Sequence, residues 1–261
     1  SIDESDILTV SASDLSTGQK RQAKIEKFEP QPYQGEAESG RPLESLRIGV
    51  SPVGCDDAGA IFRRIGLSFK QLGNHDFCNS SVVSGFDVLF LNCLCDLSQL
   101  FGWGMMCNAT KNAPALRKFV GDGGILYVSD YAFDNITKVF PSMIDFAGRK
   151  GVGGTHRVQI IDEQLAMVTG ADVHMAEFGP AYVVVNTVSS QCTVHIKKGT
   201  EPVLVSFPFG KGRVVYTSFH NSPSLSESML RVVSFIMLQT VSYATSTPLV
   251  ELVESVNINK V

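Results

Sequence analysis

The sequence predicts an α/β protein with a mostly parallel central sheet and an antiparallel extension in its second half. Three continuous apolar runs of strand length, residues 46–52, 86–94 and 124–130, alternate with helical patterns. Such runs are typical of strands that are covered on both faces, and their alternation with helices favours parallel strands joined by right-handed crossovers. Five more strand-like segments follow, of which the last two are joined by a tight hairpin at "FGKG".

The first half is expected to run strand, helix, strand, helix, strand. After strand 46–52, a helix should begin at Asp57, and Gly73 should end it, because apolar residues recur between them at helical spacing: Ile61, Phe62, Ile65, Phe69 and Leu72. A second helix should begin at Asn112 and Pro114 and end at Gly121. We predict that strands 46–52, 86–93 and 124–129 are parallel neighbours in one sheet.

The second half is less regular. Its expected strands are residues 156–162, 181–188, 192–198, 202–209 and 213–219, and a helix over residues 224–241 should close the core. The core domain is therefore expected to cover residues 46–243. Residues 1–45, which are polar and contain three prolines, form an N-terminal arm, and residues 244–261 form a C-terminal tail.

Composition narrows the classes of function. Of 261 residues, 44% are apolar and 18% are charged, which is enough for a sizeable core. Residues 1–45 contain nine acidic and five basic residues, and the rest of the chain contains 17 of each, so the net charge of −4 lies in the arm. Without a basic stripe, nucleic acid is not an expected partner. No apolar run approaches the roughly 18–20 residues of a membrane span.

The six cysteines form no CxxC pair, so no structural zinc site is expected. Free thiols in a reducing cytoplasm are the simplest interpretation of the cysteines. The acidic N-terminus is not typical of a signal peptide, and a signal peptide that has been removed is the open alternative. The five histidines are scattered singly, which predicts no bound metal. Nothing in the sequence indicates a cofactor.

The order of several motifs resembles a known superfamily. A helix ending in "LRKFVGDGG" leads into the strand "ILYVSD", and the hairpin "PVLVSFPFGKGRVVYTSFH" precedes the last helix. This order resembles the class I glutamine amidotransferase-like superfamily. The segment "GKGRVVYTSFH" resembles members related to trehalose-utilisation proteins and to β-galactosidase trimerisation domains. The resemblance covers roughly residues 46–240 and implies a flavodoxin-like three-layer sandwich.

The resemblance also implies where a site would lie. In active members, the strand after "GG" ends in an elbow with a nucleophilic Cys, a His ends a late strand, and a Glu two residues later orients that His. His220 stands at the His position, but the elbow is Val128-Ser129-Asp130-Tyr131 and Ser222 replaces the Glu. Since single triad losses cost several powers of ten in rate, this degenerate triad predicts no glutaminase activity.

The leading hypothesis is therefore a pseudoenzyme, a catalytically inactive module that binds a protein partner or a small ligand. Homo-oligomer formation through edge strands is a further option. The candidate ligand-binding residues follow strands of the predicted sheet: Gly54, Cys55, Trp103, Tyr131 and His220. The amides of Gly54 and Cys55 are a weak candidate for an anion site, because Asp56 and Asp57 are more typical of helix caps.

The alternative is a hydrolase with a rebuilt site around His220. Its nucleophile would be Ser129, Cys93 or Cys95, and Asp130 or Asp96 would orient the imidazole. Because parallel strands end at one edge of a sheet, we expect the His220 ring within about 6 Å of Ser129 or Asp130 in a shallow pocket. In a purely structural role, His220 would instead cap the turn into the last helix.

Overall fold

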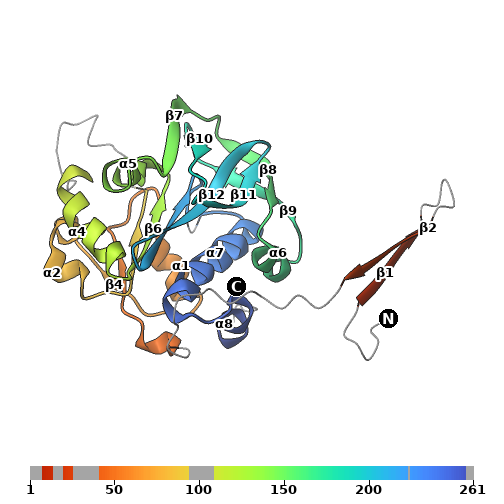
Figure 1. Ribbon diagram of the computed structural model, residues 1–261, viewed down its shortest axis with the longest axis horizontal. Helices are drawn as coiled ribbons and strands as arrows, with labels where there is room; N and C mark the ends of the chain where they lie inside the picture. Colours follow the sequence, from red (N-terminus) through yellow and green to blue (C-terminus); the bar gives the residue numbers. More distant parts are fainter. Residues whose placement is uncertain (1–7, 14–19, 26–40, 94–108, 223, 257–261) are drawn as a thin grey trace. The chain divides into compact units, whose positions relative to one another are not determined.

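The computed structural model describes residues 8–13, 20–25, 41–93, 109–222 and 224–256 (Figure 1). The chain divides into two compact units, Ser1–Ala37 and Glu38–Val261. In the first unit, β1 (Leu8–Ser13) pairs antiparallel with β2 (Lys20–Ile25), a hairpin that the sequence analysis did not predict.

The second unit contains a nine-stranded sheet whose first half is parallel. The strand order is β4-β3-β5-β6-β13-β12-β11-β8-β9. Its parallel part comprises β4 (Lys70–Gln71), β3 (Ile48–Val50), β5 (Val88–Leu91), β6 (Ile125–Ser129) and β13 (Gly212–Thr217). Strands β3, β5 and β6 are adjacent and parallel, as their apolar runs predicted.

The rest of the sheet is antiparallel, which confirms the predicted extension. It comprises β12 (Glu201–Phe209), β11 (Thr193–Lys198), β8 (Gly154–Ile160) and β9 (Val173–Phe178). Separately, β7 (Ile144–Lys150) pairs antiparallel with β10 (Val183–Val188). The sequence analysis missed β7 and β9, and only two of the six residues of β9 are fully buried, so β9 lacks a continuous apolar run.

Helices cover both faces of the sheet, so the unit is a three-layer sandwich (Figure 1). One apolar cluster joins the sheet to α1 (Ala58–Arg64), α6 (Glu163–Thr169), α7 (Glu227–Thr245) and α8 (Leu249–Ser255). The other joins it to α2 (Ser80–Val83), α4 (Ala109–Gly121) and α5 (Asp134–Val139). Neighbouring residues of β6 alternate between the clusters, Tyr127 in the first and Val128 in the second. Short 3-10 turns complete the fold at Leu43–Ser45, Asp76–Cys78 and Asp130–Phe133.

Several expected elements have different bounds. The helix α4 begins at Ala109, so that Pro114 lies inside it, and α7 runs over Glu227–Thr245 instead of residues 224–241. The helix predicted from Asp57 to Gly73 ends at Arg64, because Gly66 adopts a left-handed φ of 77° and the chain then forms β4. The apolar spacing misled because Phe69 packs back on α1, where a Cβ on Gly59 would lie 2.6 Å from its ring. The expected tail contains α8, whose Leu249 and Leu252 are buried. In the described part of the chain, no helix is long and apolar enough to span a bilayer.

Candidate functional site

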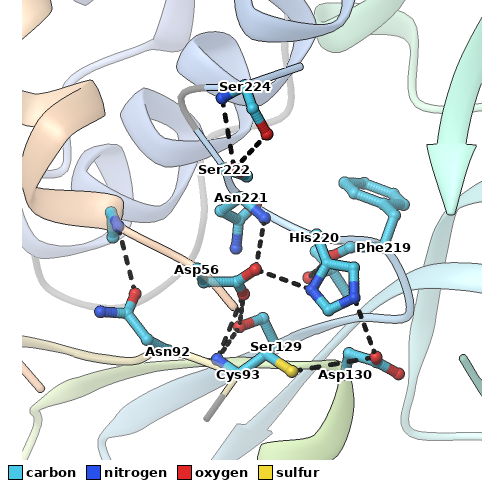
Figure 2. Close-up of polar contacts among 12 residues, drawn as sticks. Asp56, Asn92, Cys93, Ser129, Asp130, Phe219, His220, Asn221, Ser222 and Ser224 are labelled. Carbon is cyan, nitrogen blue, oxygen red and sulfur yellow. Dashed lines mark hydrogen bonds and ion pairs between the residues drawn. The ribbon is translucent and has the colours of Figure 1, made fainter. Parts of the chain in front are cut away.

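The side chains of the candidate site come from loops at one edge of the parallel sheet (Figure 2). Strands β3, β5, β6 and β13 all point the same way, so the segments that follow them meet at the carboxyl edge. These segments supply Asp56, Cys93, Asp130 and His220 in turn. Residues separated by as many as 165 positions in the chain are therefore in direct contact.

Asp56 is the centre of the hydrogen-bond network. Its side chain is buried and accepts four hydrogen bonds. Oδ1 accepts from His220 Nδ1 at 2.8 Å and from the Asn221 amide at 2.9 Å. Oδ2 accepts from the Cys93 amide at 3.2 Å and from Ser129 Oγ. Asp56 was expected to cap a helix, and this was wrong, because Asp57 alone caps α1 by accepting from the Ala60 amide at 2.9 Å.

His220 is held in one orientation. Since a carboxylate only accepts hydrogen bonds, Nδ1 carries the hydrogen that it shares with Asp56, and Nε2 faces Asp130 Oδ2 at 3.6 Å. This contact confirms the predicted proximity to Asp130. Burial lowers the pKa of His220, but the hydrogen bond with Asp56 and the charges of Asp56 and Asp130 outweigh it, so the pKa lies above its usual value.

The acid that orients His220 therefore exists, but it comes from an unexpected segment. Ser222, at the position of the family's Glu, contacts Ser224 Oγ at 2.8 Å. The expectation that Asp130 would fix the imidazole tautomer was also wrong, because 3.6 Å is longer than a hydrogen bond and Asp56 takes this role.

Asp130 occupies the elbow after β6. It has a φ of 34°, in the left-handed region that non-glycine residues rarely adopt, where the strand turns sharply into a 3-10 turn. Its buried side chain accepts from the Val183 amide at 2.7 Å through Oδ1. Burial raises the pKa of Asp130 to about 6, since the Val183 amide and the charges of His220 and Lys150 offset it only in part and Asp56 adds to the rise.

Two candidate nucleophiles lie beside these acids. Ser129 Oγ donates to Asp56 and accepts from the Cys93 amide at 2.8 Å, so it supports the carboxylate. Cys93 is a buried free thiol whose Sγ lies 3.9 Å from Asp130 Oδ2. Burial and the charges of Asp56 and Asp130 raise the pKa of Cys93 far above its usual range. Neither side chain is arranged to pass a proton to His220.

The other predicted ligand-binding residues are less central. The Gly54 amide donates to the Asp56 carbonyl at 3.0 Å and the Cys55 amide to the Cys93 carbonyl at 2.9 Å, so neither amide is free for an anion. Tyr131 follows the elbow, and its hydroxyl donates to the Ala181 carbonyl at 2.7 Å. Cys95, Asp96 and Trp103 lie outside the described residues.

The expectation of free thiols holds only in part. Cys78, Cys93 and Cys192 are free, but Cys55 is disulfide-bonded. The sequence gave no signal for this, because the six cysteines form no CxxC pair or other local motif that marks a disulfide.

Sequence reasoning also missed Gly179. Its backbone passes so close to the imidazole that a Cβ on Gly179 would lie 2.0 Å from His220 Nε2. The segment from Gly179 to Val183 therefore covers one side of the site, and Val183 contributes the amide that binds Asp130. The only local signal in the sequence is the Gly-Pro pair, Gly179-Pro180, which marks a turn between strands.

Searches with family models and among curated proteins find no match for this chain. Solved structures do match. A GMP synthase-like subunit from Thermoplasma acidophilum has a TM-score of 0.53 and 14% identity, over 77% of this chain and 94% of that one. A ThuA-like protein from Bacteroides uniformis has a TM-score of 0.56 and 10% identity, over 84% and 99%. A glutamine amidotransferase has a TM-score of 0.49 and 15% identity, over 76% and 98%.

These likenesses concern the fold, which agrees in architecture with the parallel sheet, the antiparallel extension and the two helical layers described above. The chain has the class I glutamine amidotransferase-like fold that the order of its sequence motifs predicted.

Proposed function

We propose that this domain does not hydrolyse glutamine and instead binds a small ligand beside His220. The observation that carries the proposal is Asp130 at the elbow, where active members of the resembled superfamily have a thiol. Covalent catalysis there needs a nucleophile that gives its proton to the His. A carboxylate in that place offers His220 an ion-pair partner instead.

The neighbouring groups do not replace the missing thiol. A Cys93 thiolate would lie close to two carboxylates in a buried site, which opposes its formation. The Ser129 hydroxyl is held by Asp56, and the base that should take its proton, His220, donates to that same Asp56. The arrangement stabilises charge but provides no activated nucleophile.

Burial favours a small ligand over a protein partner. Asp56, Cys93 and Asp130 are at most 1% exposed, and the His220 side chain is 14% exposed. A protein surface therefore cannot reach the acids, whereas an ion or a small polar group can reach the Nε2 side of the imidazole. A protein partner would have to use another part of the chain.

The test has two parts. First, the chain is incubated with L-glutamine and ammonia release is compared between wild type and His220→Ala. We expect no difference, and ammonia release that depends on His220 would overturn the proposal. Second, melting temperatures are compared in a panel of L-glutamine, L-glutamate, inorganic phosphate, glucose and divalent metal chlorides. At least one probe should stabilise the wild type and not His220→Ala, and the absence of any such shift counts against ligand binding.

A hydrolase remains the second candidate because His220 is oriented by a buried carboxylate, as a general base must be. Such an enzyme would activate water rather than a side-chain nucleophile. Turnover of p-nitrophenyl acetate or p-nitrophenyl phosphate that is lost in His220→Ala would favour this candidate, and equal background rates would reject it.

A further inference from the structure

Three side chains of different chemistry lie close together in the candidate site, the His220 imidazole, the Asp130 carboxylate and the Cys93 thiol. Figure 2 shows the Cys93 sulfur and the His220 ring directed toward the Asp130 carboxylate. Asp130 Oδ2 lies 3.6 Å from His220 Nε2 and 3.9 Å from Cys93 Sγ. Possible ligand atoms of Asp56, Cys93 and His220 also lie within 4.8 Å of one another. An imidazole and a thiol from separate loops thus both face the Asp130 carboxylate, and Asp56 bonds the imidazole at its other nitrogen.

We propose that His220 Nε2, Asp130 Oδ2 and Cys93 Sγ bind one divalent transition-metal ion of the zinc type. This inference rests on the proposed function, because it names the ligand that the site would bind. No metal site was expected from the sequence, because these three residues lie on separate segments and form no short metal-binding motif.

The distances suit such an ion. Zinc bonds of about 2.0–2.3 Å to nitrogen, oxygen and sulfur place tetrahedral ligand atoms roughly 3.3–3.6 Å apart. The two measured distances, 3.6 and 3.9 Å, exceed these values by a few tenths of an ångström. Small side-chain rotations can close this difference. Three protein ligands leave the fourth position for water or for a group of a further small molecule.

Asp56 has the role that a second carboxylate takes at such sites. A histidine that binds a metal through one ring nitrogen usually donates from the other to a carboxylate, which fixes the ring. His220 already donates from Nδ1 to Asp56 at 2.8 Å, and Asp56 is held in turn by three other donors. The imidazole is therefore oriented for a metal at Nε2 before any ion binds.

The charges of the three ligands match a divalent ion. A thiolate and a carboxylate carry two negative charges, so the complex with a divalent cation and a neutral imidazole is neutral, as burial requires. A thiolate and an imidazole favour zinc or cobalt over magnesium or calcium, which prefer oxygen ligands alone. The low exposure of all three side chains would limit competition from water.

The experiment uses the full chain after treatment with a chelator. The protein is loaded with Zn²⁺ or Co²⁺ and passed through a desalting column, and bound metal is measured by mass spectrometry. We expect about one equivalent per chain, and the Co²⁺ form should show the near-ultraviolet charge-transfer band of a thiolate ligand. Cys93→Ser should abolish the band and weaken binding by more than the ~10–100-fold typical of a change in the outer shell.

Asp130→Asn is the second variant, because its amide oxygen can still accept from Val183, which keeps the local fold. It should also weaken binding, and circular dichroism reports whether each variant is folded. The matched control is Cys192→Ser, which should bind metal like wild type. Cys192 is also a free thiol, half-buried, and its Sγ donates to the Met143 carbonyl.

Two results would overturn the metal site. One is a wild-type protein that retains no stoichiometric metal, and the other is metal binding that Cys93→Ser and Asp130→Asn leave unchanged. Either result leaves the proposed function standing if another probe of the panel binds beside His220. Conversely, ammonia release that depends on His220 would reject the proposed function whatever the metal content.

Discussion

His195 and His220, both in the described part of the chain, each contact an aspartate through Nδ1 and differ in the contact of the other ring nitrogen. His195 Nδ1 lies 2.6 Å from Asp162 Oδ2, much as His220 Nδ1 lies 2.8 Å from Asp56 Oδ1. The other nitrogen of His195 lies 2.7 Å from Ser206 Oγ. The other nitrogen of His220 has Asp130 at 3.6 Å, beyond hydrogen-bond range. The first ring is fully satisfied, and the second has a free position.

The difference separates a structural pair from a candidate site. Asp162 also caps α6 through the Leu165 amide and accepts from Gln239 on α7, so the His195 pair ties a helix and a strand together. Burial raises the pKa of Asp162, but the hydrogen bond with His195, the charge of His195 and the bonds from Leu165 and Gln239 outweigh it, so the pKa lies below its usual value. The His220 pair lies at the carboxyl edge of the parallel sheet, where its free nitrogen faces a carboxylate and a thiol.

The largest expected effect is on stability, from removal of the structural histidine. His195→Ala would empty the buried position of the ring and remove the partner of the half-buried Asp162, and breaking a buried pair typically costs about 3–5 kcal/mol. His220→Ala should cost only about 1–2 kcal/mol, because Asp56 keeps three other donors. Urea unfolding at pH 7 measures both. Equal costs, or a larger cost for His220→Ala, would break the distinction between the two pairs.

The second expected effect concerns pH, because the pKa of Asp130, which faces the free nitrogen of His220, is raised and the pKa of Asp162 is lowered. Asp130, the acid facing the free nitrogen of His220, has a pKa raised from 3.8 to about 6, so the folded state holds its proton more tightly than the unfolded state. Its contribution to stability is therefore complete below pH 3.8 and is lost as the pH rises through about 6. The stability of wild type relative to Asp130→Asn should fall by about 2–3 kcal/mol between pH 4 and pH 7.

The comparison with Asp130→Asn isolates Asp130 together with its effect on His220, whose pKa its charge raises, so that both contribute stability that is lost as the pH rises. Asp162 contributes the opposite trend, since a lowered pKa gives stability that is lost as the pH falls, but it is present in both proteins and cancels. The measurement is urea unfolding at several pH values. A difference between the two proteins that stays constant, or that grows with pH, contradicts the raised pKa.

The sequence was sufficient to predict the fold class and the adjacent parallel strands because the signals for them are local. Three apolar runs with helical patterns between them predicted that β3, β5 and β6 are parallel neighbours, and the order of motifs predicted the fold that the matching solved structures share. Where side chains packed across the fold, local patterns misled. Phe69 continued the helical spacing of α1 but packs back on Gly59 from beyond its end.

The site was predictable only in part for the same reason. His220 and Asp130 follow strands, so their meeting could be inferred from the common edge of the sheet. Asp56 could not be assigned, because two adjacent acids before a helix both resemble caps, and one suffices. A second acid in that place, in the loop that follows a parallel strand, is the signal that could have suggested a partner for His220.

The smallest expected effect separates those adjacent acids. Asp57→Ala removes the cap that accepts from the Ala60 amide and should cost about 1 kcal/mol, since Asn92 Oδ1 still accepts from the first turn of α1. It should leave the pKa of His220 unchanged, as followed by NMR of the imidazole. Asp56→Asn should lower that pKa, because it removes the charge that stabilises the imidazolium but keeps a hydrogen-bond acceptor. If both variants lowered the pKa of His220 equally, Asp56 would be no more than one charge among several near the imidazole, and its assignment as the orienting acid would fail.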